Sequence, residues 1–214
     1  MAKYTLYQKN EREIRSNIVF GIVASVVLFL LAAAVIFNNL LFVKVYVNGS
    51  SMYPTLKSGD IVSLSVFRTP NYGDIVVISG EKENGDWLIK RAIAFGGDSV
   101  KIENGKVFLK KTGETDFSEL EEPYLNGRAI TFYPNVNNRD NVAPFVISVE
   151  KDCVFYLGDN RMNSKDSRSE FGSCKKEQIV GVVSEFSLNF RGFNAFWEKI
   201  SAPIKNFFGI STQV

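Results

Sequence analysis

Two segments of the sequence carry residue types that together could perform nucleophilic chemistry. Ser51 lies within the run Gly49 to Pro54, just after a long apolar stretch. A serine on such a sharply turning backbone can present both its hydroxyl and its backbone N–H to a substrate. Lys90 and Arg91 interrupt an otherwise apolar run from Leu88 to Ala94. A hydroxyl nucleophile and an amine base are therefore both available.

The base must be something other than histidine, because the 214 residues include none. This excludes a Ser-His-Asp triad, a Cys-His pair and an HExxH zinc site. Side chains alternate across a strand, so Lys90 and Arg91 face opposite sides and one of them points to the more buried face. Burial favours a neutral amine, and lowering a lysine pKa by about three units costs ~4 kcal/mol. A guanidinium stays protonated. Lys90 is therefore the candidate base, although a surface lysine is the alternative from composition alone.

The elements that position these residues begin with a long apolar segment. Twenty uncharged, mostly apolar residues run from Ile18 to Phe37, and the uncharged stretch continues to Val43. Twenty residues in a helix cross the ~30 Å hydrocarbon core of a bilayer. Four basic residues lie in the preceding flank, and no small-residue cleavage site follows. We therefore predict a cytoplasmic N-terminus (1–17) and an uncleaved transmembrane anchor (18–43), with a buried soluble helix as the alternative.

After the anchor, short alternating runs separated by turn residues predict a mainly β domain of about 150 residues. The dipeptide Asn104-Gly105 between two such runs is a strong hairpin signal. No long amphipathic helix is expected between the strands. The remaining strands are expected at Phe42–Val47, Asp60–Phe67, Asp74–Ser79, Trp87–Phe95, Ala129–Tyr133, Phe145–Val149, Val154–Leu157 and Ile179–Phe190.

Three further features leave alternatives open. Cys153 and Cys174 could form one disulfide outside the cytoplasm, or could be two unpaired core residues. The four Gly-Asp dipeptides are more typical of turns than of a metal site. The tail, residues 191–214, places aromatic and aliphatic residues at helical spacing, which suits either core packing or a membrane interface.

Three motifs follow one another along the chain: Ser51 to Leu56, then Lys90-Arg91 followed by Gly97-Asp98, then Gly158 to Arg168. Together they resemble the conserved boxes of type I signal peptidases. Glu122-Pro123-Tyr124-Leu125 is a further similarity. The resemblance implies a mainly antiparallel β catalytic core (44–106 and 150–190) with a smaller β excursion (107–149).

The resemblance also implies roles for individual residues. Ser51 would attack the scissile carbonyl, Lys90 would take its proton, and the Ser51 N–H would be one oxyanion donor. Ser164 would hydrogen-bond and orient Lys90, and Asp166 and Arg168 would form a supporting ion pair. Some family members carry a serine as second oxyanion donor where this chain has Gly49. That donor stays open, with Ser50 or a water as candidates, and we expect Gly49→Ser to be tolerated.

The implied substrates are exported preproteins with small residues at the first and third positions before the cut. They would bind as an added strand along Trp87 to Ile89. The candidate residues for shallow apolar substrate pockets are Val47, Met52, Leu56 and Ile89. We expect a monomer that contacts membrane lipid, needs no cofactor or metal, and binds no nucleic acid, with its catalytic domain outside the cytoplasm.

Two other protein classes compete with this interpretation. Non-catalytic signal-peptidase-like proteins assist pilus assembly after losing the catalytic pair, whereas this chain retains Ser51 and Lys90. Self-cleaving Ser-Lys regulators of related fold are soluble and carry DNA-binding regions, and the predicted anchor argues against that class. An enzyme of the signal peptidase type is therefore favoured.

Overall fold

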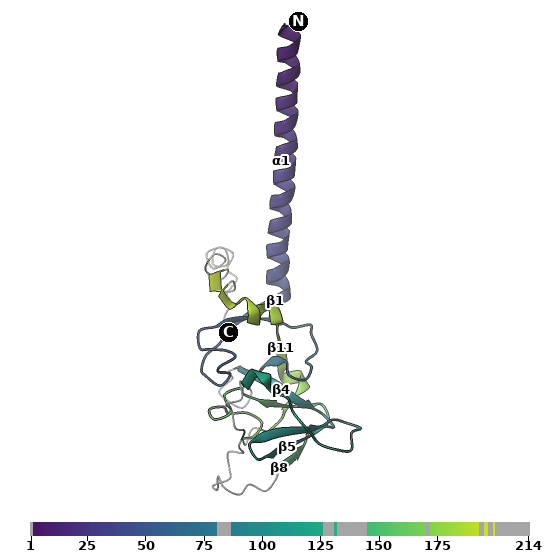
Figure 1. The fold of residues 1–214 in the computed structure, drawn as a ribbon, viewed down its shortest axis with the longest axis vertical. Coiled ribbons are helices and arrows are strands. Elements are labelled where there is room, and N and C mark those ends of the chain that lie inside the picture. Colours follow the sequence, from purple (N-terminus) through teal and green to yellow (C-terminus); the bar gives the residue numbers. More distant parts are fainter. Residues whose placement is uncertain are drawn as a thin grey trace. The chain divides into compact units, whose positions relative to one another are not determined.

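The computed structural model describes residues 2–80, 87–125, 131, 145–169, 172–192, 195–196 and 199. The chain divides into two compact units, Met1–Phe42 and Val43–Val214. Apart from Phe42, which begins β1, the described part of the first unit is one helix, and the second unit contains the remaining strand residues (Figure 1).

The first unit consists of helix α1 (Ala2–Leu41). Its segment Glu13–Ala33 has 21 residues with a mean hydropathy of 2.4, and all of their side chains are exposed. At the helical rise of about 1.5 Å per residue this segment matches the thickness of a bilayer core. Among the described residues it is the one helix long and apolar enough to cross a membrane. This helix contains the apolar segment predicted from the sequence and suits membrane anchoring.

The second unit is built on a seven-stranded sheet in the order β1-β2-β11-β3-β4-β9-β10. The pairings of β2 with β11, and of β3, β4, β9 and β10 with their neighbours, are all antiparallel. The mainly β, antiparallel class expected from the sequence is therefore confirmed. The strands are β1 (Phe42–Tyr46), β2 (Ile61–Ser65), β3 (Ile75–Ile78), β4 (Leu88–Phe95), β9 (Cys153–Leu157), β10 (Cys174–Lys175) and β11 (Ile179–Val183).

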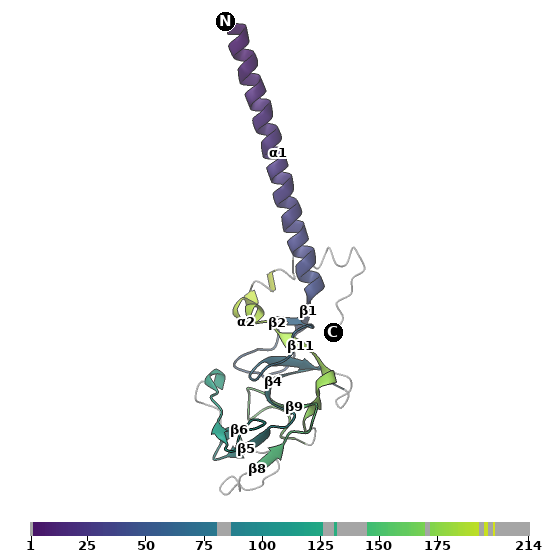
Figure 2. The ribbon, with the colours of Figure 1, turned by 90° about the vertical axis from the view of Figure 1, so that its right-hand side faces the viewer.

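A smaller antiparallel sheet follows β4, in the order β7-β6-β5-β8. Its strands are β5 (Ser99–Glu103), β6 (Lys106–Lys110), β7 (Ser118–Glu119) and β8 (Phe145–Ser148), and Figure 2 shows β5, β6 and β8 gathered together. Asn104 and Gly105 join β5 to β6 with φ of 51° and 77°. Two positive φ values are what the predicted hairpin turn requires. The sheet begins at Ser99, earlier than the excursion (107–149) expected from the sequence.

Both faces of the larger sheet are buried. Alternate residues of β3 pack on opposite sides: Ile75 and Val77 belong to one apolar cluster, and Val76 and Ile78 belong to another. A strand buried on both faces reads as a continuous apolar run, as β3 does. A third cluster, which includes Phe155 and Leu157 of β9, fills the space between the two sheets.

The structure departs from the predicted strands mainly after β11. The strand expected over Ile179–Phe190 ends at Val183, and helix α2 (Glu185–Asn189) follows. The Ser184 side chain caps this helix by accepting a hydrogen bond from Ser187 N, which explains why the apolar run changes conformation there. Two short 3₁₀ helices, Pro123–Leu125 and Lys176–Gln178, were also not predicted. The strand expected at Ala129–Tyr133, Thr131 excepted, and most of the 191–214 tail lie outside the described residues.

Candidate active site

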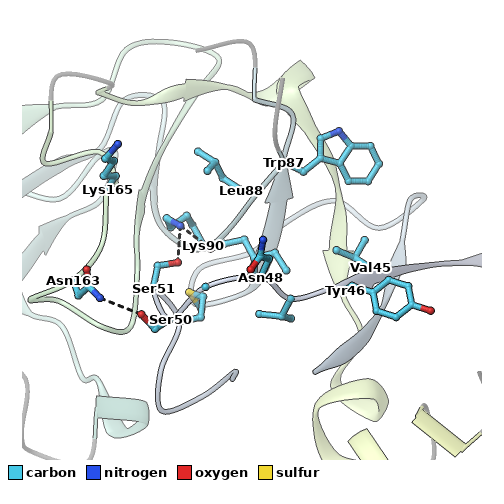
Figure 3. A pocket seen from close by; sticks show the side chains of 14 residues that line it. Val45, Tyr46, Asn48, Ser50, Ser51, Trp87, Leu88, Lys90, Asn163 and Lys165 are labelled. Carbon is cyan, nitrogen blue, oxygen red and sulfur yellow. Dashed lines mark hydrogen bonds between the residues drawn. The ribbon is translucent and has the colours of Figure 1, made fainter. Parts of the chain in front are cut away.

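The structure brings Ser51 and Lys90 into direct contact although 39 residues separate them. Lys90 extends from β4 toward Ser51, as Figure 3 shows, and its Nζ lies 2.9 Å from Ser51 Oγ. The amine also donates to the Ile89 carbonyl at 3.0 Å, and Lys90 is only 4% exposed. The distance lies within the range that proton transfer between a hydroxyl and a general base needs. Once neutral, this amine could accept the Ser51 proton.

The turn that carries Ser51 is held by its own backbone. Gly49 has a φ of +93°, and Tyr53 N donates to the Ser50 carbonyl at 3.0 Å. An L residue rarely adopts such a φ, so any side chain at position 49 would strain the turn even though nothing lies within 4 Å of an added Cβ. The backbone thus explains this glycine and argues against the expected tolerance of Gly49→Ser.

The motif from Gly158 to Arg168 packs against this turn through its asparagines. Asn160 N donates to the Ser51 carbonyl at 2.9 Å, and Asn160 Nδ2 donates to the Ser50 carbonyl at 3.0 Å. Asn163 Nδ2 donates to Ser50 Oγ at 3.0 Å (Figure 3). A segment that would pass for a polar surface loop in the sequence therefore supports the turn that carries Ser51.

Ser164 differs from its expected role. Its Oγ is buried and, among the described residues, has no hydrogen-bond partner, so the expected hydrogen bond to Lys90 is absent. Lys90 instead donates to Ser51 Oγ and to the Ile89 carbonyl. Ser164 lies against Gly158, where an added Cβ would come within 2.2 Å of Ser164 Oγ.

Asp166 and Arg168 form a buried ion pair with two parallel hydrogen bonds. Arg168 Nε donates to Asp166 Oδ1 at 2.8 Å, and Nη2 donates to Oδ2 at 2.9 Å. Their residues are 0% and 2% exposed. Asp166 Oδ2 also accepts from Gly158 N at 3.0 Å, and Arg168 Nη2 donates to the Arg161 carbonyl at 2.9 Å. The pair therefore fixes the backbone on both sides of Asn160.

On the opposite face of β4, Arg91 connects the site to the rest of the fold. Its Nε and Nη2 donate to the two oxygens of Asp159 at 2.8 and 2.6 Å, and its guanidinium lies 3.7 Å from the centre of the Tyr124 ring. Asp159 also accepts a hydrogen bond from Thr55, four residues after Ser51. Arg161 pairs with Glu122. Burial raises the pKa of Tyr124 well above its usual value, and the Glu122 carboxylate raises it further.

A cleft of about 460 Å³ lies beside the Ser51–Lys90 pair. Three of the four residues expected to form substrate pockets, Val47, Met52 and Ile89, line it. Leu56 does not, because it is 0% exposed and packs in the core beneath the turn. Sequence alone could not separate these two outcomes, since both involve an apolar side chain. The whole lining is Val45, Tyr46, Val47, Asn48, Gly49, Ser50, Ser51, Met52, Trp87, Leu88, Ile89, Lys90, Asn163 and Lys165.

The start of β4 lines one side of the cleft. Residues Leu88–Lys90 of β4 pair with β3 on one side, whereas on the other side the described pairing with β9 begins only at Arg91. Leu88–Lys90 line the cleft, and so does the segment from Val45 to Gly49. An extended peptide could hydrogen-bond between the two.

Sequence reasoning assigned no role to Asn160, Asp159 or Thr55, although all three lie within the quoted motifs. The available signal was the motif itself: residues shared across a family motif without an obvious chemical task often hold the others in place. Their partners lie about a hundred residues away in the chain, at separations of 104 for Thr55–Asp159 and 110 for Ser50–Asn160.

Comparisons with known proteins identify a family for this chain. Residues 20–187 match the family described as "Signal peptidase, peptidase S26". The chain is 32% identical to signal peptidase I U of Bacillus subtilis over 84% of this chain and 91% of the relative. It is 33% identical to signal peptidase IB of Staphylococcus aureus over 86% and 98%. A crystal structure of a signal peptidase I from Enterococcus faecalis is 27% identical, with a TM-score of 0.42 over 55% of this chain and 98% of that one.

Proposed function

The chain belongs to the signal peptidase family, peptidase S26, whose members are serine endopeptidases that remove signal peptides, and from this premise we propose that Ser51 and Lys90 are its catalytic dyad. The observation that carries the proposal is the 2.9 Å contact between Lys90 Nζ and Ser51 Oγ at the edge of a cleft. No histidine exists to act in place of the lysine.

In the proposed reaction, Ser51 Oγ attacks the scissile carbonyl carbon while neutral Lys90 takes the hydroxyl proton. The resulting oxyanion accepts a hydrogen bond from the Ser51 N–H. When the C–N bond breaks, Lys90 returns the proton to the leaving amine of the mature protein. Lys90 then takes a proton from water, the hydroxide attacks the ester, and the proton passes to Ser51 as the signal peptide leaves. Burial of Lys90 supports this role, since an apolar environment disfavours the ammonium form.

The proposed substrates are exported preproteins, bound as an extended strand between Leu88–Lys90 and Val45–Gly49. The first residues of β4, which precede its described pairing with β9, supply main-chain partners, and the apolar lining from Val47, Met52 and Ile89 suits small side chains before the cut. We propose that α1 anchors the enzyme in the cell membrane with a cytoplasmic N-terminus, because basic residues precede its apolar segment. Confinement of enzyme and substrate to one bilayer raises their effective concentration.

The dyad is tested with the full chain in detergent and a peptide that carries Ala-x-Ala before the scissile bond. Ser51→Ala and Lys90→Ala should each abolish cleavage while the thermal unfolding midpoint stays close to that of the wild type. Wild-type activity should rise with pH as Lys90 loses its proton. Lys101→Ala, which changes a lysine of the smaller sheet, is the matched control. Substantial activity in Lys90→Ala would remove the mechanism.

The topology has its own test. Protease added to cells after removal of the wall should degrade the residues beyond α1, because the proposed orientation places them outside. Protection of that domain in intact cells, with degradation only after lysis, would reverse the orientation.

A further inference from the structure

Among the described residues, the peptide group between Ser50 and Ser51 is held from one side only, by contacts to its oxygen. The Ser50 carbonyl accepts two hydrogen bonds, from Tyr53 N at 3.0 Å and from Asn160 Nδ2 at 3.0 Å. The first is internal to the turn, whereas the second comes from a residue 110 positions away. Asn160 is thus the long-range partner of this peptide.

The orientation of that peptide decides where the Ser51 N–H points. The Ser50–Ser51 bond is trans, so its C=O and N–H groups point in opposite directions within one plane. Fixing the carbonyl therefore fixes the N–H. No described residue accepts a hydrogen bond from the Ser51 N–H, and both Ser50 and Ser51 line the cleft. This donor is available to a group that enters the cleft.

We propose that Asn160 is a positioning residue for the oxyanion hole: its side-chain amide holds the Ser50 carbonyl so that the Ser51 N–H is aimed at the developing oxyanion. The inference rests on the proposed function, because it concerns the same acyl-transfer step. It predicts a loss in the transition state rather than in substrate binding, since the N–H meets full negative charge only after Ser51 attacks.

A second contact makes the inference testable without dismantling the site. Asn160 N donates to the Ser51 carbonyl at 2.9 Å, and this backbone bond survives any side-chain substitution except proline. Asn160→Ala and Asn160→Asp therefore leave the loop attached while removing the donor to the Ser50 carbonyl. The aspartate keeps the size of the side chain but places a carboxylate against that carbonyl oxygen.

Kinetics of the full chain in detergent with the Ala-x-Ala peptide form the first measurement. Removal of an oxyanion donor costs ~10² to 10³ in kcat, so a misdirected donor should cost at least ~10-fold. We expect this loss in kcat for both variants, an unchanged KM, and a pH profile with its Lys90 limb unmoved. Asn160→Gln, which keeps an amide on a longer arm, should recover part of the rate. Asn189→Asp, an exposed change of the same kind in α2, is the control.

A second measurement needs no substrate. In full chain labelled with 15N-serine, the Ser51 N–H is identified by its loss in Ser51→Ala. Its order parameter should fall from about 0.85, typical of rigid backbone, toward values below about 0.6 in Asn160→Ala. Wild-type kcat in both variants, or a raised KM at unchanged kcat, would overturn the inference while the proposed function stands. If the wild type cuts no peptide, the proposed function fails. The order parameter of the Ser51 N–H then still tests Asn160, because an unchanged value in Asn160→Ala would overturn the positioning role.

Discussion

Gly158 is the position where a single methyl group should disturb the active site most directly. In Gly158→Ala the new Cβ would lie 2.6 Å from the Ser51 carbonyl oxygen, 2.2 Å from Ser164 Oγ and 2.6 Å from Ser164 Cβ. Real Cβ atoms essentially never approach neighbours closer than 3.0 Å. The turn that carries Ser51 and the Ser164 side chain must therefore both move.

The size of the movement can be worked from these distances. Ordinary van der Waals contact begins at 3.4 Å, so the Ser51 carbonyl must withdraw by about 0.8 Å, from 2.6 to 3.4 Å. A displacement near 1 Å at a reacting group can cost ~10² in rate. Overpacking of this kind also destabilises the fold by about 1–3 kcal/mol. We expect kcat/KM of Gly158→Ala to fall by roughly 10²-fold, with a modest decrease in the unfolding midpoint.

The double variant Gly158→Ala/Ser164→Gly separates the two clashes, because it removes the Ser164 side chain and leaves the contact with the Ser51 carbonyl. We expect it to recover only part of the lost rate, measured as initial cleavage rates of the Ala-x-Ala peptide. Gly192→Ala is the control, since nothing lies within 4 Å of an added Cβ there and its φ is not positive. A wild-type rate in folded Gly158→Ala would refute the reasoning, and full recovery in the double variant would assign the whole effect to Ser164.

Three further predictions follow from particular residues. Gly49→Ala and Gly49→Ser should lower kcat/KM to a similar extent, because a φ of +93° strains any side chain; an active serine variant beside a poor alanine variant would instead point to the hydroxyl. A thiol-reactive reagent should detect both Cys153 and Cys174 as thiols in denaturant without reductant. The strand register places Cys153 opposite Lys175 and Cys174 opposite Val154, so the two side chains lie on opposite faces of the sheet. A mass gain of two hydrogens on reduction would contradict this. Asp166→Asn should lower the free energy of unfolding by about 3–5 kcal/mol, because it leaves the buried Arg168 without its carboxylate; chemical denaturation with an unshifted midpoint would disprove it.

The sequence determined those features whose causes are local. The apolar segment within α1 follows from composition and length alone, and the Asn104-Gly105 turn follows from two residues that tolerate positive φ. The preference for Lys90 over Arg91 as the candidate base also needed no coordinates, because a guanidinium stays protonated whereas an amine can lose its proton. Where local signals were ambiguous the prediction was wrong. The sequence predicted that the strand continues past Val183, whereas in the structure Ser184 caps a helix there.

Only the tertiary structure decided which of the candidate residues meet. Alternation fixes the side of a strand that a residue faces, but strand order and register fix its neighbours, and these depend on packing between distant segments. The placement of β4 between β3 and β9 sets Lys90 against Ser51, and the described pairing with β9 begins only at Arg91, after the residues that line the cleft. The same packing buries Leu56 beneath the turn, leaves Ser164 without the expected partner, and brings Asn160 onto the Ser50 carbonyl. Residues about a hundred positions apart in the chain share no local sequence pattern. The sequence can therefore predict which residues belong to the site, but not which of them are in contact.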